Sequence, residues 1–468
     1  KFVIFIKTYE RYQLGVKMGI SGLLPFLESV SKTCHLNELQ GTTAAIDAYG
    51  WLHQGALSCA HKLAAGESSD EYVDYCFKYI NLLRSYNIKL IMVFEGQLLP
   101  AKKETEKTRN EQRELARTRA TELLNTGQAD QALEYFRESI DITHEMALAL
   151  IKECRNKRID CIVAPYKAGA QLAYLNACGI ADIIITEDSD LILFGCSKIL
   201  FKFNLDGCGV LVEKQRLNDA MKMKSDKYSF EKFRHMCMIS GCDYLDPLPG
   251  ISLNDAHKAI SLTQNPDIYQ LIPRLPEYLN SDKIVVTPEY IENFKLADAT
   301  IKHQIIFDPL NRRQVPLTDP EIAGANSDYL KNTGQIDNSD RAFQLALGNI
   351  DPIKSNVVNN WNPDTDETIT ADSIWSSTCP PSKRAKIEMK STLPDKENQI
   401  NISDPFMKPK KLNKFPSVNM DTKMQSISHS QMTSLAPVRR IRARRASVAI
   451  GGGLAQLSNE DLSSNSHG

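Results

Sequence analysis

Four acidic residues lie at or just beyond the ends of short apolar segments: Asp47, Glu95, Asp188 and Asp190. Carboxylates that a fold brings together from separate segments repel one another, which raises the cost of ionising all of them unless cations neutralise the charge. Hard oxygen ligands of this kind suit Mg²⁺ or Mn²⁺. Any one of these acids could equally be a helix cap or a loop residue. Four acids at equivalent positions favour a metal site.

The apolar segments that precede these acids have the length of buried strands. Four such segments are residues 44–47, 88–94, 161–164 and 183–186. Helical periodicity over residues 73–83, following Asp70, and over residues 170–177 predicts helices between them. Strands that alternate with helices predict an α/β fold with a mostly parallel central sheet flanked by helices. Ligands of such sheets bind beyond the carboxyl ends of the strands, where the acids lie.

A run of basic residues interrupts this alternation after Glu95. Residues 101–124 mix Lys and Arg with Glu, and Arg109, Arg113 and Arg117 fall on one face of the expected helix. A basic stripe beside an acidic metal cluster could hold phosphates over the metal ions, since Lys and Arg neutralise phosphate charge. A solvated helix held by ion pairs is the alternative for the segment taken alone. Its position directly after Glu95 favours phosphate binding.

Two helices joined by a turn are expected around residue 245. Residues 230–239 have helical periodicity, residues 240–251 contain the Gly and Pro residues of a turn, and another helix is expected from Asn254. Such a turn can present backbone amides or carbonyls to a phosphate or a cation, which would hold duplex DNA without reading its bases. A plain helical hairpin in the core is the alternative.

The composition argues against several protein classes. The chain has 468 residues and a formal net charge of -1, so local charge must identify any nucleic-acid surface. Its 11 cysteines are odd in number and include no C-x-x-C pair, which supports neither a zinc site nor a secreted disulfide framework. The apolar runs are too short for a membrane-spanning helix, so we expect no membrane contact.

Six segments resemble a known family: residues 18–24 (MGISGLL), 46–53 (IDAYGWLH), 93–96 (VFEG), 164–175 (APYKAGAQLAYL), 185–191 (ITEDSDL) and 240–245 (SGCDYL). Together they resemble the N-terminal and internal regions of the flap endonuclease and XPG-type 5′ nuclease family. Three more are similar to the exonuclease 1 branch of that family: residues 307–309 (FDP), 346–349 (ALGN) and 361–364 (WNPD). The resemblance covers residues 18–365.

The resemblance implies a metal-dependent 5′-to-3′ exonuclease for double-stranded DNA, with 5′ flap endonuclease activity, that acts in mismatch repair and in end resection during recombination. It implies a PIN-like nuclease domain in which two Mg²⁺ ions are held by Asp47, Glu95, Asp188, Asp190 and Asp243. Lys102 and Arg109 match the catalytic basic residues that steer the scissile phosphate from a helical gateway. Tyr49 and His53 match positions near the bent DNA junction. The basic face of the expected helix adds Arg113 as a DNA-binding residue.

A helix-two-turn-helix element is also implied by the resemblance. Its backbone carbonyls hold a K⁺ ion against the duplex that is not cleaved. Residues at its turn match DNA-binding positions: Ser240, Gly250 and Ile251. Ser252 stands where the family usually has glycine, and this difference argues against a K⁺ site.

Three residues depart from the metal-site pattern of the family. Glu95 replaces an aspartate and keeps its charge. Lys167 replaces a glutamate and Gly169 replaces an aspartate, and neither an ammonium group nor a glycine can ligate a metal ion. These two changes move the formal charge of the site by about three units toward positive. We therefore expect impaired binding of one metal ion, and the alternative function is a catalytically weak family member that binds DNA and recruits repair proteins.

The resemblance also divides the chain into regions. We expect an N-terminal extension outside the fold (residues 1–17), an N-terminal nuclease region with the basic gateway (residues 18–118), an internal nuclease region with the helix-two-turn-helix element (residues 119–350) and a disordered tail (residues 351–468). Basic clusters at residues 381–386 and 439–445 predict nuclear localisation. The expected partners are double-stranded DNA with 5′ ends, nicks or flaps and, through the tail, mismatch-repair proteins. We expect a monomer.

Overall fold

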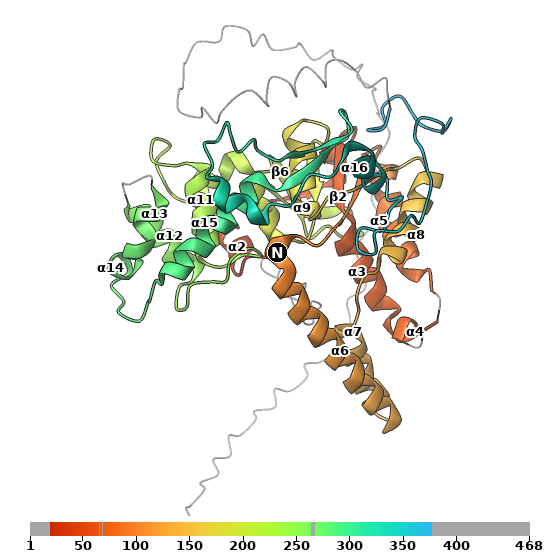
Figure 1. Ribbon diagram of the computed structural model, residues 1–468, viewed down its shortest axis with the longest axis horizontal. Helices are drawn as coiled ribbons and strands as arrows, with labels where there is room; N and C mark the ends of the chain where they lie inside the picture. The colour runs from red at the N-terminus through yellow and green to blue at the C-terminus, as the bar shows by residue number, and fades with distance from the viewer. Residues whose placement is uncertain (1–18, 65, 68, 264–266, 377–468) are drawn as a thin grey trace, which may run out of the picture. The chain divides into compact units, whose positions relative to one another are not determined.

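A seven-stranded sheet forms the centre of the computed structural model, which describes residues 19–376 apart from residues 65, 68 and 264–266 (Figure 1). The strand order is β1-β7-β6-β5-β2-β3-β4. The strands are β1 (Lys32–His35), β2 (Thr43–Asp47), β3 (Lys89–Phe94), β4 (Asp160–Val163), β5 (Ile183–Ile185), β6 (Lys198–Phe201) and β7 (Cys208–Glu213). Strands β2 to β6 pair in parallel, and β7 pairs antiparallel with β6 and β1. The mostly parallel sheet and its four expected strands are confirmed.

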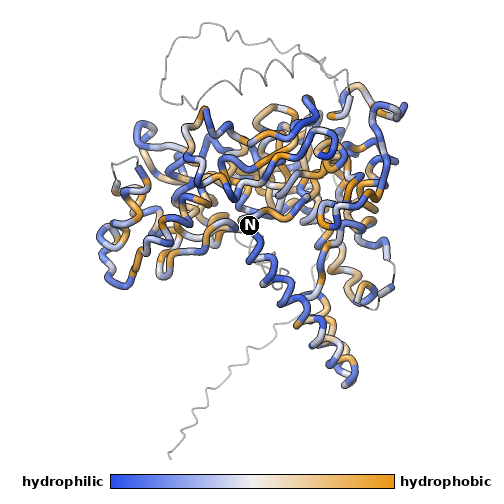
Figure 2. Tube along the Cα trace, in the orientation of Figure 1, coloured by the Kyte–Doolittle hydropathy of each residue, from blue (hydrophilic) through white to orange (hydrophobic). Residues whose placement is uncertain are grey.

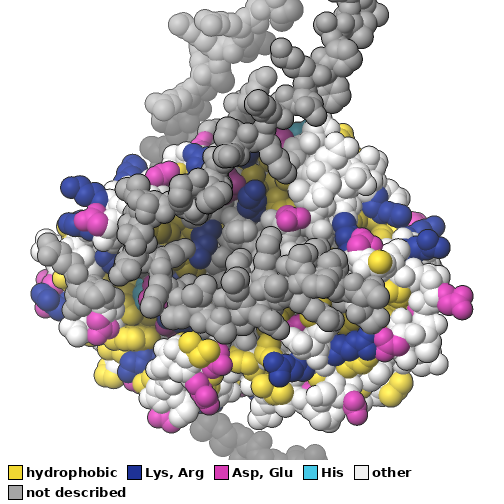
Figure 3. Space-filling model, turned by 90° about the horizontal axis from the view of Figure 1, so that it is seen from above, with side chains coloured by type: hydrophobic (Ala, Val, Ile, Leu, Met, Phe, Trp, Pro, Cys, Tyr) yellow, Lys and Arg dark blue, Asp and Glu magenta, His cyan; other side chains and the backbone are white. Residues whose placement is uncertain are grey.

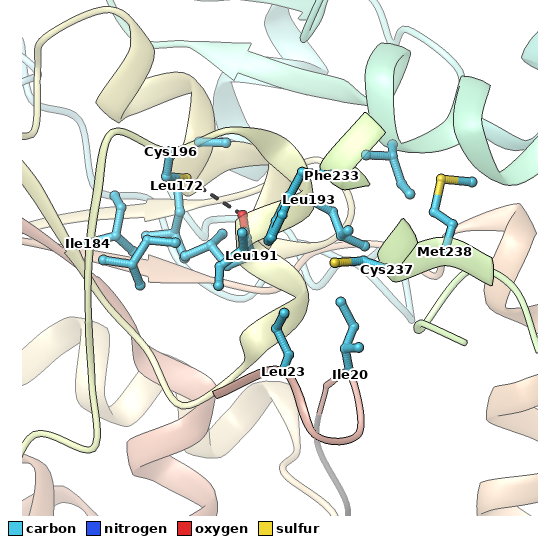
Figure 4. Close-up of a cluster of buried hydrophobic side chains, with 14 of the residues drawn as sticks. Ile20, Leu23, Leu172, Ile184, Leu191, Leu193, Cys196, Phe233, Cys237 and Met238 are labelled. Atoms are coloured by element: carbon cyan, nitrogen blue, oxygen red, sulfur yellow. Dashed lines mark hydrogen bonds between the residues drawn. The ribbon is translucent and has the colours of Figure 1, made fainter. Parts of the chain in front are cut away.

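Helices cover both faces of this sheet because alternate strand residues point to opposite sides. On β2, Ala45 belongs to one buried core, whereas Ala44 and Ile46 belong to the other. One core contains side chains of α3 (Ala48–Ser58), α5 (Glu71–Ser85) and α8 (His144–Asn156). The other contains side chains of α9 (Ala168–Ala177), α11 (Phe230–Ile239), α12 (Leu253–Leu262) and α15 (Pro288–His303). Figure 4 shows part of this second core, where Leu172, Leu191 and Phe233 converge.

The remaining elements extend these two layers. The other helices are α2 (Leu23–Phe26), α4 (Ala60–Ala64), α6 (Lys103–Asn125), α7 (Ala129–Glu138), α10 (Leu217–Ala220), α13 (Ile268–Leu271), α14 (Leu275–Leu279) and α16 (Ser339–Ala346). Strands β8 (Ile305–Asp308) and β9 (Arg313–Pro316) form a separate antiparallel pair. Among the residues that the structure describes, no helix is both long and apolar enough to cross a membrane.

Helices α6 and α7 form a hairpin that projects away from the sheet (Figure 1). They pack on each other through a small separate apolar cluster: Ala120, Leu123, Ala132 and Phe136. Figure 2 shows that the part of α6 nearest the sheet is mostly hydrophilic. The hairpin is therefore held mainly by its own packing, and the half of α6 nearest the sheet exposes mostly polar side chains.

The C-terminal strap, residues 361–376, crosses the edge strand β4. Asp160 on β4 accepts hydrogen bonds from the Ser373 hydroxyl and from the Ile374 amide, the latter at 3.0 Å. The indole of Trp375 is 3% exposed and donates to the Cys161 carbonyl at 3.1 Å. The boundary expected at residue 350, between the nuclease region and a disordered tail, is therefore wrong. The segment is polar on average, but a few of its apolar side chains, such as Ile374 and Trp375, are buried on the core. The expected extension at residues 1–17 and both basic clusters of the tail lie outside the described residues.

Candidate active site

The carboxyl ends of three neighbouring strands place the four acids of the sequence pattern around one pocket. Asp47 ends β2, Glu95 follows β3, and Asp188 and Asp190 follow β5. Asp243, from the turn after α11, joins them. The pocket has a volume of about 430 Å³ including its open mouth, and it is also lined by Lys167, Gly169 and Tyr244. The expected convergence of these acids is confirmed, and their roles as metal ligands stay a prediction.

Hydrogen bonds fix the orientation of the acids on β2 and β5. The Thr186 hydroxyl donates to Asp47 Oδ2 at 2.9 Å and accepts from the Asp188 amide at 3.1 Å. The Asp190 amide donates to Asp188 Oδ1 at 3.0 Å, and the Asp243 amide donates to Asp190 Oδ2 at 2.6 Å. Thr186 was not expected to have this role. Its place two residues before Asp188 is the only signal of it in the sequence.

Burial and mutual repulsion make these acids hard to ionise. Burial raises the pKa of Asp47 to about 6, and the charge of Glu95 contributes. Burial also raises the pKa of Asp188 to about 7, with contributions from Asp243 and Asp47. The pKa of Asp190 is raised by burial and by the charge of Asp188. A cation placed among these groups would therefore be stabilised by several carboxylates at once.

Two ammonium groups and one guanidinium group neutralise the remaining acids. Lys167 Nζ lies 2.7 Å from Glu95 Oε2. Lys102 Nζ lies 2.8 Å from Asp243 Oδ1, and Arg109 Nη2 lies 3.4 Å from the same oxygen. Burial would raise the pKa of Asp243, but Lys102, Lys167 and Arg109 together hold this pKa below its usual value. The pKa of Lys167 is raised, because the attraction of Glu95 outweighs the cost of burial.

The fit of a metal ion differs between the two sides of the pocket. Within the described ranges, no three His, Cys, Asp or Glu side chains come close enough to hold one ion in the present arrangement. On the β5 side, Asp190 Oδ1 is buried without a hydrogen-bond partner, and the hard carboxylates of Asp188 and Asp243 line the same pocket. On the β3 side, the Lys167 ammonium group already contacts Glu95. Of the two sides, the β5 side therefore has the donor chemistry that suits a divalent cation, once its carboxylates move closer together than they lie here.

Gly169 lies in the first turn of α9 and faces this pocket. A Cβ atom at Gly169 would lie 3.3 Å from Phe194 Cε2 and 3.7 Å from Leu191 Cδ1. These are flexible side-chain ends, so a small shift of Phe194 would admit a larger residue. The backbone at residue 169 is helical and needs no glycine.

The arginines of α6 are ion-paired along the helix. Arg109 contacts Glu106 and Asp243, Arg113 contacts Glu106 and Asp141, Arg117 contacts Glu114, and Arg119 contacts Glu122. The salt-bridged helix, which was the alternative for this segment, is thus present, although Arg109 also reaches the pocket. Figure 3 shows basic and acidic side chains intermingled on the face that it displays. Phosphate binding by this helix stays a prediction.

Two residues expected to contact DNA lie on the first two turns of α3, directly after Asp47. Tyr49 and His53 are half-buried. Burial and then the charges of Glu95 and Asp141 raise the pKa of Tyr49, so its hydroxyl stays protonated. Burial lowers the pKa of His53, and the neighbouring charge of Arg113 adds to this. Tyr49 and His53 thus share one helix, and their contact with DNA stays a prediction.

The expected helix-turn-helix is formed by α11, the turn at residues 240–252 and α12. Ser240 ends α11, and Gly250 has a φ of +84°, a conformation that favours glycine. Ile251 is buried against the core. Ser252 caps α12 through a capping box with Asp255 and has a φ of -90°, so the backbone at this position does not require glycine. The serine at this position therefore leaves the turn undistorted.

Comparisons with known proteins place this geometry in a family. Residues 18–116 match the XPG N-terminal domain, and residues 158–243 match the XPG I-region. The chain is 32% identical over 312 residues to the DNA damage-inducible protein DIN7 of Saccharomyces cerevisiae, a match covering 66% of this chain and 71% of that protein. The chain belongs to the XPG-type nuclease family. Nucleases of this family are metal-dependent.

Other members of the family resemble the chain more strongly. It is 48% identical over 348 residues to Exonuclease 1 of Drosophila melanogaster, covering 74% of this chain and 48% of that protein. The chain thus spans about half the length of this curated relative, and its type within the family is that of exonuclease 1. The catalytic core of Rad2 in complex with DNA substrate superposes with a TM-score of 0.43 at 20% identity, covering 58% of this chain and 83% of that one.

Proposed function

We propose that the chain is a metal-dependent nuclease that degrades double-stranded DNA in the 5′-to-3′ direction and cuts 5′ flaps during DNA repair. The observation that carries the proposal is the group of acids at the carboxyl ends of β5, β2 and β3, with Lys102 and Arg109 beside it. A carboxylate cluster next to basic side chains suits a phosphodiester substrate. The relatives described above are named as nucleases or as DNA-damage proteins, which favours an enzyme over a protein that only recruits others.

The metal proposed here is Mg²⁺, held on the β5 side by Asp188 and Asp190 with Asp47 and Asp243 beside them. A bound Mg²⁺ polarises a phosphoryl oxygen and lowers the pKa of its water ligand. Thr186 holds Asp47 in place for this site through its hydroxyl. We propose that binding of the family's second metal ion is weakened, because Lys167 neutralises Glu95 and Gly169 offers no oxygen ligand.

Lys102 and Arg109 bind the scissile phosphate in this proposal. Both contact Asp243, so an arriving phosphate competes with one carboxylate for two cations. Lys102 is 3% exposed, and its Nζ lies 5.3 Å from the centre of the Tyr244 ring, a cation–π contact that helps to hold the ammonium group in place. Lys102 therefore meets the phosphate without a large loss of side-chain entropy.

The duplex that is not cleaved is proposed to bind the helix-turn-helix. The turn orients the backbone of Ser240, Gly250 and Ile251, whose carbonyls would hold K⁺, and the positive charge of that ion would favour a nearby DNA phosphate. Tyr49, His53 and Arg113 are proposed to contact the DNA near its cut end. We further propose a nuclear monomer whose tail binds mismatch-repair proteins, a part of the chain outside the described residues.

The proposal is tested with residues 18–468 on a 5′-recessed duplex and a 5′-flap duplex in Mg²⁺. The expected products are short fragments released from the labelled 5′ end and a cut at the flap base. Asp188→Asn is expected to abolish them, and Ser252→Gly, which leaves the acids untouched, is expected to retain them. If neither substrate were cut by this protein or by a variant with Lys167→Glu and Gly169→Asp, the nuclease assignment would fail.

A further inference from the structure

Five basic side chains without an ion pair among the described residues lie close together in the sequence between β7 and α11. We call residues 214–227 the basic segment. Its basic side chains are Lys214, Arg216, Lys222, Lys224 and Lys227, set against two acids, Asp219 and Asp226. Within the part of the chain that the structure describes, none of these five forms an ion pair within 4.0 Å. Every arginine of α6 does form one.

The basic segment is attached to both helices of the helix-turn-helix. His257 on α12 donates from Nε2 to the Met221 carbonyl at 2.8 Å. Lys214 Nζ lies 4.5 Å from the ring centre of Phe230, the first residue of α11. The segment therefore packs against both helices that carry the turn assigned to the intact duplex, and contacts with these helices fix its position.

The charges of this segment point outward. Lys222, Lys224 and Lys227 are exposed, and Lys222 adopts a φ of +51°, which marks a sharp change of chain direction. Ammonium groups spread along a surface without acidic partners suit a row of phosphates, because each phosphate that they neutralise releases a condensed counterion. An acidic peptide would fit the charge alone, whereas continuity with the helix-turn-helix favours the same duplex.

We propose that the basic segment is a second phosphate-binding surface for duplex DNA. It would add to the contacts that the helix-turn-helix makes with the backbone of the intact duplex. This inference rests on the proposed DNA-binding function. Sequence-independent affinity for DNA comes from Lys222, Lys224 and Lys227. The arginines of α6 contribute less to this affinity, because their ion pairs with acidic residues must break before they can bind a phosphate. The segment positions the substrate and takes no part in cleavage.

The test replaces Lys222, Lys224 and Lys227 with Gln in the full chain and measures duplex affinity at several salt concentrations. A matched control replaces three exposed lysines whose helices pack on the opposite face of the sheet: Lys78, Lys152 and Lys157. Both variants lose the same net charge and leave the core intact. Gln tolerates the positive φ at residue 222 as well as Lys does.

In the first variant, the slope of log affinity against log salt is expected to fall by about 2.7, because each of the three phosphates that is no longer neutralised lowers it by about 0.9. The slope is expected to stay unchanged in the control. Dissociation constants equal in the two variants would overturn the inference while leaving the proposed function intact. An unmodified protein without salt-dependent duplex binding would overturn both. Circular dichroism melting of each variant verifies that the fold is retained.

Discussion

Restoring the two missing acids should restore the metal site. The double reversion Lys167→Glu and Gly169→Asp removes the ammonium group that lies 2.7 Å from Glu95 and adds two carboxylates to the pocket. We expect faster cleavage of a 5′-recessed duplex and tighter binding of Mg²⁺, with unchanged affinity for DNA. The reason is electrostatic, because a site with fewer negative charges holds fewer cations.

The size of the effect follows from the position of the charge. Reversion shifts the formal charge of the pocket by about three units toward negative. The Lys167 side chain is only 22% exposed, so solvent screens it in part. One unit charge about 4 Å from another contributes up to about 4 kcal/mol at an effective dielectric constant of ~20. After allowance for screening, we expect about 3 kcal/mol, which is roughly a hundredfold in metal affinity.

Two readouts and two controls make this prediction refutable. Calorimetry measures Mn²⁺ or Mg²⁺ affinity without DNA, and single-turnover cleavage measures the rate. Lys167→Gln removes the cation without adding a ligand, and Gly169→Ala reproduces the 3.3 Å approach to Phe194 without adding charge. Lys167→Gln is expected to recover part of the metal affinity, and Gly169→Ala is expected to recover none of it. Equal metal affinities and equal rates for the starting protein and the double reversion would refute the reasoning.

Three further predictions concern other parts of the chain. Trp375→Ala should lower the free energy of unfolding by about 3–5 kcal/mol, because the buried indole holds the strap against β4. Denaturant unfolding measures this change, and a loss under about 1 kcal/mol would show that the indole does not stabilise the fold in this way. Arg109→Gln with Arg113→Gln should weaken duplex binding and its salt dependence, because phosphate contacts release counterions; an unchanged salt slope in filter binding would remove α6 from the DNA surface. A reporter fused to residues 377–468 should accumulate in the nucleus through the two basic clusters, and an even distribution by microscopy would count against this.

The strands that carry the acids were predictable because their apolar residues end abruptly in a carboxylate. Residues 44–47 and 88–94 became β2 and β3 almost without change of bounds. The antiparallel strands β1 and β7 were not predicted, since β1 is an edge strand and both strands carry charged residues such as Lys32 and Glu213. Helix α3 was missed as well, because it begins directly after Asp47 with no polar spacer.

The site was harder to predict than the sheet that positions it. Acids at strand ends can be inferred from a buried parallel sheet, but ion pairs depend on side-chain placement across distant segments. The ion pair between Lys167 and Glu95 joins residues 72 positions apart in the sequence. The ion pair between Lys102 and Asp243 likewise joins two distant segments of the chain. Sequence alone indicated that Lys167 could not ligate a metal ion. It did not indicate which acid the ammonium group would neutralise.

The strap over β4 has a consequence for the way the protein is made. Asp160 and Ser373 are separated by 213 positions in the chain, so β4 leaves the ribosome long before the residues that cover its edge. At about 5–20 residues per second, synthesis of the intervening chain takes roughly 10–40 s. During that time the nascent chain carries an unpaired strand edge, which is the feature that other chains can pair with. The yield of folded protein in cells should therefore depend on the supply of chaperones, even if the finished fold is stable.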